Sequence, residues 1–481
     1  MNKSPFDHIM NAKSIAFFGA SNNPLTMGTT QITHLVRGGY EGKVFPVHPK
    51  EKTVLGVPAY KSVHDIPETP DLAILVLPTR LVPQIIDECG EKGIKYAVII
   101  SGGFKERGEE GRELENDLKN AAEKHGVRFV GPNCIGVINA DNKFNCTFYP
   151  YLMDSGPMGL LSQSGTYVTQ VIPYLEKRGI RYSKAVSLGN EANIDLVDGL
   201  EYLAWDPGTK SIALYIEGIK RGREFVETAK RVSMIKPIVA YYVGGTEAGA
   251  RSGASHTGSM GGDDTIHDRM FRQCGIVRAP SIEMLYDWAW ALAVTTQPKG
   301  RRVAIISHSG GPVTSMADAC SRNDMDVPAF SENTRNKISG MVPPTGSTIN
   351  PVDLTFSTNP GDITGKIPKA IFETGEVDAV LVHGVGGNGL IRTLKIEAPD
   401  LIPMDIFEID KNIAKLHGDM VDLAKNKKCP IIGSSFDDMT DAAVKYVTTN
   451  DVAVYPTPER AVMAMAALMQ YTDWKRAREN D

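Results

Sequence analysis

The sequence has few cysteines and no long apolar run. Its six cysteines among 481 residues are widely separated, with no C-x-x-C pair; they are Cys89, Cys134, Cys146, Cys274, Cys320 and Cys429. We therefore expect reduced thiols and no zinc site. No uninterrupted apolar stretch reaches the roughly 20 residues that cross a bilayer, and the N-terminal residues lack the apolar core of a signal peptide. These absences predict a cytoplasmic protein without a membrane partner.

A basic excess is also missing. The chain has 52 Lys and Arg residues against 57 Asp and Glu, a net charge of -5. This argues against a nucleic-acid surface, which needs a positive excess. A smaller acidic ligand is still compatible with a local basic patch.

Short apolar runs alternate with amphipathic segments through nearly the whole chain, which is typical of parallel α/β units. The length suggests several domains. We expect a Rossmann-like domain over residues 1–150, a second domain over 151–298 and a third over 299–481. The strands expected in these three blocks are 14–20, 43–47, 71–78, 96–101 and 127–132, then 184–189, 211–218 and 237–245, then the apolar starts of 303–312, 377–387 and 430–435.

The second and third blocks open alike, at 159–172 and 303–317, with a buried strand, Ser-x-Ser-Gly and a helix. This predicts a duplicated unit. The free N–H groups of a helix start attract anions, and glycine lets the backbone approach them. The two turns predict one phosphoryl group held between two positive helix ends; the alternative is that strand-to-helix turns favour Ser and Gly without a ligand. The residues concerned are Ser164, Gly165, Thr166, Ser309, Gly310 and Gly311.

The first strand-to-helix turn of the chain contains Gly19, Ser21 and Gly28. Such a turn presents backbone N–H groups to phosphate. The dinucleotide fingerprint G-x-G-x-x-G is absent, and His48 stands where an NAD site would carry Asp or Glu. His48 and the nearby Lys50 suit a phosphorylated ribose instead. The alternative is a turn with no ligand.

One histidine, His256, stands among small residues in RSGASHTGSMGG (251–262). A phosphoryl carrier must expose its imidazole and move between donor and acceptor, and small, glycine-rich neighbours allow both. The alternative is a flexible surface loop in which the histidine is incidental.

Glu217 ends an otherwise apolar strand, at the edge where ligand sites of α/β sheets cluster. A carboxylate there can accept a hydrogen bond from one imidazole nitrogen and leave the other nucleophilic. Without such a partner it is a strand-end acid facing water. We interpret the following Lys220, Arg221 and Arg223 as a solvated helix start and not as phosphate ligands.

Together these motifs resemble the alpha subunit of NDP-forming (ADP-forming) acyl-CoA synthetases, in the succinyl-CoA ligase superfamily. The resemblance covers nearly the whole chain. The motifs that carry it are GASNNP, GGYEGKVFPVHPK (38–50), VGPNCIGVIN (130–139), LSQSGT (161–166), SLGNEANID (187–195), GASHTGS (253–259), SGGP (309–312) and INPVDLT (349–355).

The resemblance implies a Rossmann-like CoA-binding domain followed by two flavodoxin-like ligase domains. It implies that a carboxylic acid, CoA and ATP are converted reversibly to acyl-CoA, ADP and phosphate, through an acyl phosphate and a phosphohistidine. By position the phosphohistidine is His256 and its orienting carboxylate is Glu217, and the two Ser-Gly turns hold phosphate. The positions matching the CoA site are Gly19, Ser21, Lys50, Pro78, Asn133 and Cys134. Cys134 is not expected to be a nucleophile, because the reacting thiol belongs to CoA.

The family also needs an ATP-grasp module, for which this chain has no remaining length. We therefore expect a separate beta subunit, in an α2β2 assembly, that binds the nucleotide and its Mg²⁺. His308 stands where related sequences often carry a non-ionisable residue, so its role is open. Two alternatives remain: a non-catalytic CoA-binding or regulatory protein of the same fold, and an NAD-dependent oxidoreductase, against which His48 counts.

Overall fold

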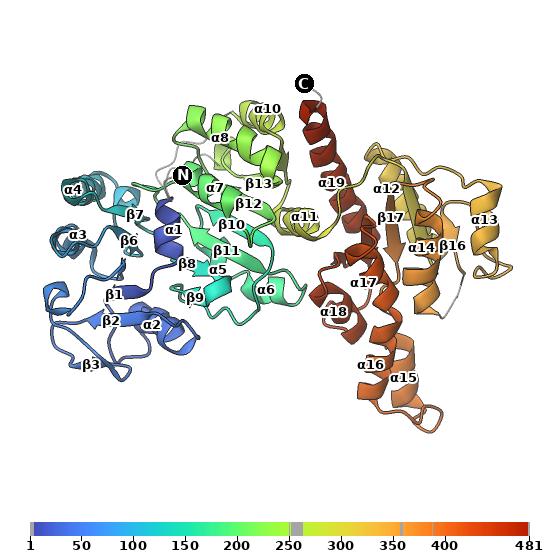
Figure 1. The fold of residues 1–481 in the computed structure, drawn as a ribbon, viewed down its shortest axis with the longest axis horizontal. Helices are drawn as coiled ribbons and strands as arrows, with labels where there is room; N and C mark the ends of the chain where they lie inside the picture. Colours follow the sequence, from blue (N-terminus) through green and yellow to red (C-terminus); the bar gives the residue numbers. More distant parts are fainter. Residues whose placement is uncertain (1–3, 250, 252–262, 356–358, 387, 480–481) are drawn as a thin grey trace. The chain divides into compact units, whose positions relative to one another are not determined.

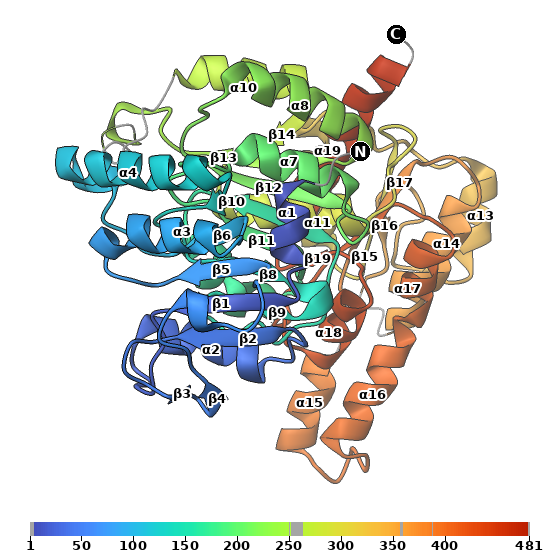
Figure 2. The same cartoon turned by 60° about the vertical axis from the view of Figure 1, so that its left-hand side comes forward.

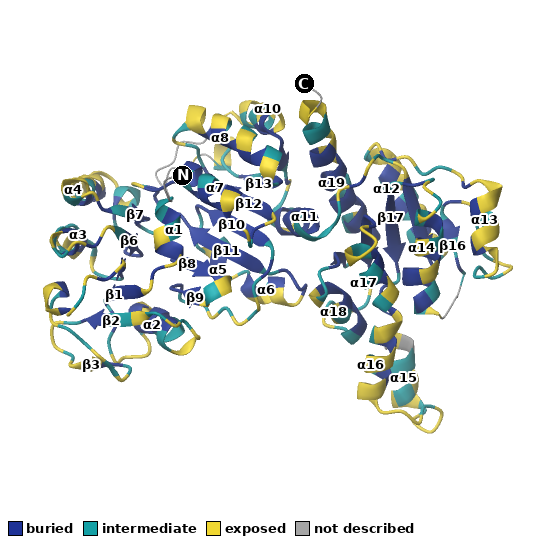
Figure 3. Cartoon of the chain, in the orientation of Figure 1, coloured by how far each residue is buried: buried dark blue, intermediate teal, exposed yellow. Residues whose placement is uncertain are grey.

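The computed structural model describes residues 4–249, 251, 263–355, 359–386 and 388–479. The chain forms two compact units, which Figure 1 colours from blue to red along the sequence. Unit 1 comprises Met1–Pro173 and Arg181–Leu285, and unit 2 comprises Tyr174–Ile180 and Tyr286–Asp481. In both units the strands are buried and the helices carry the exposed residues on their outer faces (Figure 3).

The first sheet of unit 1 has five parallel strands in the order β2-β1-β5-β6-β7. They are β1 (Ser14–Phe18), β2 (Lys43–Val47), β5 (Leu72–Leu75), β6 (Tyr96–Ile99) and β7 (Arg128–Val130). Its helices are α1 (Pro5–Met10), α2 (Met27–Arg37), α3 (Val82–Glu91) and α4 (Glu109–His125). Figure 2 shows α3 and α4 side by side.

Strand β1 shows why the strands of this sheet have continuous apolar sequences. Ile15 and Phe17 enter the core shared with α1 and α2, whereas Ala16 and Phe18 enter the core under α3 and α4. Successive strand residues point to opposite faces, and helices cover both faces of a parallel sheet. Every position of the strand is therefore apolar or buried.

The second sheet of unit 1 has seven strands in the order β14-β13-β12-β10-β11-β8-β9. They are β8 (Val137–Asn139), β9 (Phe144–Asn145), β10 (Met158–Ser162), β11 (Tyr182–Ser187), β12 (Ser211–Ile216), β13 (Ile238–Tyr242) and β14 (Ile276–Arg278). Strands β8 and β9 pair antiparallel at its edge. Its helices include α5 (Thr166–Thr169), α7 (Leu196–Trp205), α8 (Gly222–Ile235) and α10 (Asp264–Cys274).

Unit 2 contains a parallel sheet in the order β16-β15-β17-β18-β19. Its strands are β15 (Val303–Ser307), β16 (Val352–Asp353), β17 (Ala379–His383), β18 (Ile431–Ser434) and β19 (Val454–Tyr455). Its helices include the end of α11 (Ile282–Val294), α12 (Gly310–Arg322), α13 (Glu332–Ser339), α14 (Ile367–Phe372), α15 (Asn388–Glu397), α16 (Ile406–Leu416), α17 (Gly418–Lys425), α18 (Ala442–Thr449) and α19 (Pro458–Glu479).

The parallel strands of all three sheets follow one order. In each sheet the second strand lies outside the first, and the third, fourth and fifth follow on the other side. The order reverses between the first and third strands, and ligands of such sheets bind there, at the carboxyl ends. This switch point lies between β1 and β5, between β10 and β12, and between β15 and β17.

The strands expected from the sequence are present, most of them with shorter bounds; β2 has the predicted bounds, and β11 is shifted by two residues from the predicted 184–189. The sequence analysis missed several strands of two or three residues, among them β8, β9 and β16, because so short a segment has no visible periodicity. Within the described ranges, no helix is both long and apolar enough to cross a membrane.

Candidate active site

The switch point of the first sheet is tightly packed around two glycines. Gly19 has a φ of +92°, and a Cβ there would lie 1.9 Å from the carbonyl oxygen of Val76. A Cβ on Gly28 would lie 2.2 Å from the carbonyl oxygen of Gly19, so α2 packs directly on the turn. Pro78 follows β5 and is exposed. The structure thus brings Gly19 and Pro78 to the edge where a ligand is expected.

Two other residues of the predicted CoA set differ in their surroundings. Ser21 is held by Thr29, whose Oγ1 accepts the Ser21 N–H at 3.0 Å. Lys50 is exposed, and its ammonium group has no partner among the described residues. His48 Nδ1 accepts the N–H groups of Lys50 (3.1 Å) and Glu51 (2.9 Å). The His48 imidazole thus stabilises the turn 48–51 by binding backbone N–H groups. It does not occupy the Lys50 ammonium group, which is available to an anion.

Asn133 and Cys134 follow β7 at the same edge. Asn133 has a φ of +56°, and its Nδ2 donates to Oδ1 of Asn190 at 3.3 Å. Cys134 Sγ donates to the carbonyl oxygen of Ile99 at 3.3 Å, and burial raises the pKa of this thiol to about 12. The thiol therefore stays protonated at neutral pH, as expected for a residue that is not a nucleophile.

The turn after β10 lies at the switch point of the second sheet. The Ser162 hydroxyl donates to the carbonyl oxygen of Ser164 at 2.7 Å and accepts the Ser164 N–H at 3.2 Å. Among the described residues, the backbone N–H groups of Gly165 and Thr166 have no hydrogen-bond partner. The turn therefore offers two donors to an anion.

The helix after this turn is shorter than the sequence predicts. Helix α5 ends at Thr169, and α6 (Ile172–Glu176) begins only after a break. Pro173 in the first turn of α6 has no N–H to donate to the carbonyl of Thr169. A four-residue helix has little macrodipole, so the prediction of a strongly positive helix end at this turn is wrong. Only its unpaired N–H groups remain as anion donors.

Glu217 follows β12, across the same switch point. Its side chain is only 7% exposed, and within the described ranges Oε2 is buried without a hydrogen-bond partner. This excludes the interpretation of a strand-end acid facing water. Burial, and secondly the charge of Glu217, raise the pKa of the neighbouring Tyr215 phenol, which stays protonated. Burying an unpaired carboxylate oxygen is costly, so the site is built for a donor.

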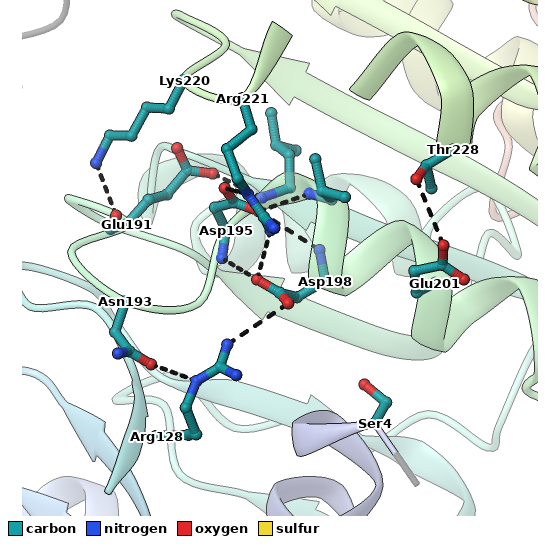
Figure 4. A network of polar contacts seen from close by, with 12 residues as sticks. Ser4, Arg128, Glu191, Asn193, Asp195, Asp198, Glu201, Lys220, Arg221 and Thr228 are labelled. Atoms are coloured by element: carbon teal, nitrogen blue, oxygen red, sulfur yellow. Dashed lines mark hydrogen bonds and ion pairs between the residues drawn. The ribbon is translucent and has the colours of Figure 1, made fainter. Parts of the chain in front are cut away.

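Lys220 and Arg221 stand at the start of α8 and stay accessible to solvent, as predicted, with 40% of the Arg221 side chain exposed, but both also bind groups of the protein. Figure 4 shows both side chains in a polar network. The Arg221 guanidinium binds Asp195 (Nε–Oδ2 2.6 Å) and Asp198 (2.8 Å), because α8 begins one residue later and directs this side chain toward α7. Lys220 Nζ donates to the carbonyl oxygens of Asn190 (2.6 Å) and Glu191 (2.7 Å). Both cations are satisfied within the protein.

Glu191 is the buried centre of that network. Its Oε1 accepts the N–H of Leu196 at 3.0 Å, and its Oε2 accepts Nε2 of Gln163 at 2.9 Å. Burial raises the pKa of Glu191 to about 7, although the Lys220 charge opposes the shift. Burial, and then the charge of Lys105, lower the pKa of Lys220 to about 8. The loop 187–195 is therefore held by groups that titrate near neutral pH.

The third sheet presents the start of α12 at its switch point. Ser309 is the N-cap residue, and its hydroxyl makes no capping hydrogen bond. Among the described residues, the N–H groups of Gly310 and Gly311 are unpaired, and Pro312 has none to offer. A Cβ on Gly311 would meet nothing within 4 Å. Because α12 has 13 residues, the expected positive helix end is present here.

Two histidines lie at the same edge of unit 2. His308 and His383 stack with ring centroids 6.1 Å apart. His308 Nδ1 is buried without a hydrogen-bond partner among the described residues, and the ring packs against Gly384. His383 Nδ1 lies 3.0 Å from Ser434 Oγ, and burial, then the charge of His308, lower the pKa of His383 to about 4. His383 is therefore neutral at physiological pH.

His256 lies outside the described residues. Gln163, Glu191 and His383 were not identified from the sequence as site residues. Gln163 directly follows β10, Glu191 lies in the loop after β11, and His383 is the last residue of β17. Each position is beside a switch point, and that position was the signal available. All six cysteines are buried, and none of them is in a disulfide. In the part of the chain that the structure describes, no cluster of three or more His, Cys, Asp or Glu side chains could hold a metal ion.

Comparison with known proteins agrees with this architecture. Residues 13–140 match the family model of a CoA binding domain, and residues 155–292 match that of the succinyl-CoA ligase like flavodoxin domain. Acetyl-coenzyme A synthetase 1 of Ca. Korarchaeum cryptofilum, solved with phosphate and ADP, superposes with a TM-score of 0.87 and 33% identity. The match covers 100% of this chain and 99% of that one.

Sequence relatives cover the chain equally well. The alpha subunit of ADP-forming acetate–CoA ligase I of Pyrococcus furiosus is 37% identical over 474 residues, 97% of this chain and 98% of that subunit. The ADP-forming 4-hydroxybutyrate–CoA ligase of Nitrosopumilus maritimus is 34% identical over 485 residues, 99% of this chain but only 65% of that enzyme. The fold class and the resemblance predicted from the sequence are thereby confirmed. The chain belongs to the family of ADP-forming acyl-CoA ligase alpha subunits.

Proposed function

We propose that this chain is the catalytic alpha subunit of an ADP-forming acyl-CoA synthetase, which interconverts acid, CoA and ATP with acyl-CoA, ADP and phosphate. The observation that carries the proposal is the buried Oε2 of Glu217, which has no hydrogen-bond partner among the described residues. Glu217 follows β12 beside the switch point, where the turn after β10 has two N–H groups that are likewise unpaired in the described ranges. A carboxylate in this position needs a donor, and an imidazole N–H supplies one.

The reaction divides into two phosphoryl transfers and one acyl transfer. In the synthetic direction the phosphoryl group moves from ATP to a nitrogen of His256, and ADP leaves. The substrate carboxylate then attacks phosphorus, the N–P bond breaks, and an acyl phosphate forms. The CoA thiol attacks the acyl carbon, and phosphate leaves with the bonding electrons. Glu217 accepts the other imidazole N–H and so stabilises the charged ring.

The backbone holds the phosphate. In unit 1, the N–H groups of Gly165 and Thr166 have no partner among the described residues and are available to phosphate oxygens. In unit 2, the same holds for Gly310 and Gly311. We propose that Ser164 and Ser309 contribute hydroxyl donors. Charge-assisted bonds of this kind contribute about 1.5–3 kcal/mol each, and such positioning and charge stabilisation dominate phosphoryl transfer.

CoA binds at the switch point of the first sheet. We propose that the turn of Gly19 and Ser21 approaches its phosphates, that the Lys50 ammonium pairs with one of them, and that Pro78 packs against the cofactor. Asn133 and Cys134 lie toward the thiol end. The proposed domain limits are 1–150, 151–298 and 299–481, although β8 and β9, from the first of these ranges, pair with the second sheet.

We propose a separate ATP-grasp beta subunit, in an α2β2 assembly, as the nucleotide-binding partner. The 4-hydroxybutyrate–CoA ligase, of which this chain covers 65%, has about a third of its length beyond the matched region. In our proposal Mg²⁺ enters with the nucleotide on the partner and neutralises phosphate charge there.

Labelling tests the proposal against a non-catalytic CoA-binding role. The chain and its partner are incubated with acetyl-CoA and radiolabelled phosphate, and acid-labile, base-stable label is mapped by mass spectrometry. We expect label on His256 in the wild type, none in His256→Ala, and slower labelling in Glu217→Gln, with CoA affinity unchanged in both variants. If no histidine is labelled although CoA binds, the regulatory role replaces the catalytic one.

A further inference from the structure

The side chain of Gln163 uses its full hydrogen-bonding capacity. It lies in the turn after β10 and is 7% exposed. Oε1 accepts the N–H groups of Glu217 (2.5 Å) and Gly218 (3.0 Å). Nε2 donates to the carbonyl oxygen of Gly218 (2.7 Å) and to Oε2 of Glu191 (2.9 Å). Two acceptor positions and two donors are all satisfied, which fixes the orientation of the amide.

This amide extends the pairing of β10 with β12 beyond the end of the strands. The Gln163 backbone N–H donates to the carbonyl oxygen of Tyr215 at 3.2 Å. The Gln163 side chain then binds the backbone of Glu217 and Gly218, the two residues that follow the end of β12. No strand neighbour supplies these contacts, because β12 ends at Ile216. Gln163 therefore fixes the backbone from which the Glu217 carboxylate projects.

The same amide connects this backbone to loop 187–195. Its partner Glu191 is faced by Lys220, whose Nζ binds the Glu191 carbonyl oxygen, and by the Asp195 carboxylate. The N–H of Leu196 occupies the other Glu191 oxygen. Gln163 thus stands between the anion-binding turn, the Glu217 carboxylate and a buried carboxyl group.

We propose that Gln163 is a positioning residue that aims the Glu217 carboxylate at the phosphohistidine and thereby sets the rate of phosphoryl transfer. The proposal rests on the function proposed above. Gln163 does not touch the phosphoryl group in this scheme. It acts by holding the Glu217–Gly218 backbone in register with the turn that binds the phosphate.

The substitution Gln163→Glu tests this without changing the size of the side chain. It replaces the Nε2 donor with an oxygen that faces the Glu191 carboxyl group. A proton shared between the two carboxyl groups restores the bond to Glu191, whereas the donation to the Gly218 carbonyl oxygen stays lost at every pH. Removal of the shared proton leaves two negative charges in contact. We therefore expect phosphorylation of Gln163→Glu to be slower than that of the wild type throughout, to come closest to it near about pH 6, and to fall about a further tenfold by about pH 8.5.

Two further variants separate positioning from folding. Gln163→Leu removes all four bonds and should slow phosphorylation about tenfold or more at every pH. The double variant Gln163→Glu/Glu191→Gln restores a single carboxylate–amide pair and should abolish the added pH dependence. The control Ser183→Ala removes a buried 2.6 Å hydroxyl pair with Thr209 elsewhere in the second sheet and should leave the phosphorylation rate unchanged.

Phosphohistidine formation from acetyl-CoA and radiolabelled phosphate is measured in the complex with the partner, and CoA binding reports the folded fraction. Superimposed pH profiles of wild type and Gln163→Glu, or wild-type labelling of Gln163→Leu, would overturn the inference while leaving the proposed function intact. Absence of label in the wild type would overturn the proposed function itself. If the single variants do not fold, a pH dependence of phosphorylation in the double variant that is steeper than in the wild type refutes the positioning role.

Discussion

The charge cluster of unit 2 offers a quantitative test of the fold. The Asp287 side chain is 2% exposed, and Arg178 and Arg460 both bind its carboxylate. Arg178 approaches Oδ1 at 2.8 Å, and Arg460 approaches Oδ2 at 2.6 Å through one nitrogen and 2.9 Å through another. The cluster joins residues 174–180 to α11 and α19 within this unit. We predict that Asp287→Ala destabilises unit 2 severely.

The magnitude follows from what the substitution leaves behind. Arg178 has 6% of its side chain exposed and Arg460 has 18%, so two largely buried guanidinium groups would lose the Asp287 carboxylate. Removing one partner of a buried ion pair costs about 3–5 kcal/mol. A domain is stable by only about 5–15 kcal/mol, so about a fifth or more of the stability of unit 2 should be lost.

Urea denaturation measures the effect. The midpoint should fall while the slope of free energy against urea stays constant, because the surface exposed on unfolding is unchanged. The control is Asp318→Ala, which removes an exposed pair with Arg322 whose side chains are 61% and 75% exposed. Such a pair contributes about 0.5 kcal/mol or less and is screened by salt.

The result that contradicts this reasoning is a loss of less than about 1 kcal/mol in Asp287→Ala. Equal losses in the two variants would also contradict it, because burial would then make no difference. High salt discriminates further: the Asp287→Ala effect should persist in about 1 M NaCl, where exposed pairs are screened.

Three other predictions use the same structure. Gly19→Ala should unfold or strongly destabilise the CoA-binding domain, as measured by calorimetry, because its Cβ would overlap a backbone carbonyl. The control Gly56→Ala has a φ of +83° and open space around it, so it should cost only the backbone strain of about 1–2 kcal/mol. Equal losses of stability in the two variants would contradict this prediction. The pKa of His383 is lowered from 6.5 to about 4 in the folded protein. Its contribution to the free energy of unfolding is therefore complete above pH 6.5 and is lost as the pH falls toward 4, by about 3 kcal/mol in total. His383→Gln should flatten this part of the stability–pH curve, and an unchanged slope would refute the assignment. Finally, iodoacetamide at about pH 8 should modify no cysteine of the folded protein, because all six thiols are buried. Mass spectrometry detects alkylation, and rapid alkylation of the folded protein would contradict this prediction.

Much of the candidate site could be predicted because it lies where strands end. The runs ending at Gly19, Ser162 and Glu217 are buried on both faces, so their apolar composition marked the strands and the first polar residue marked the carboxyl edge. The turn at Gly19 could be predicted for a similar reason, because only a residue without a Cβ fits there beside the neighbouring strand. The three-sheet fold followed from the same alternation.

The helix after Ser164 shows where local patterns were insufficient. Its residues resemble those at the start of α12, yet Pro173 interrupts the hydrogen-bond ladder, and one turn results instead of a 13-residue helix. The partners of Lys220 and Arg221 were missed for a related reason. Charged side chains in a row are usually solvated, and nothing in the local sequence reveals that loop 187–195 brings carbonyls and carboxylates against them.

The sequence by itself determined the order of strands and helices, the family, and the turns at which ligands are expected, because burial periodicity, glycine stereochemistry and motif spacing are local properties. The tertiary structure alone decided which side chains meet across a switch point: that Gln163 binds the backbone of Glu217, that Glu191 is buried against it, and that His308 stacks on His383. Such pairings join residues from about 30 to 75 positions apart in the chain, and only the packing of strands β10, β12, β15 and β17 in parallel sheets brings them within hydrogen-bonding or stacking distance.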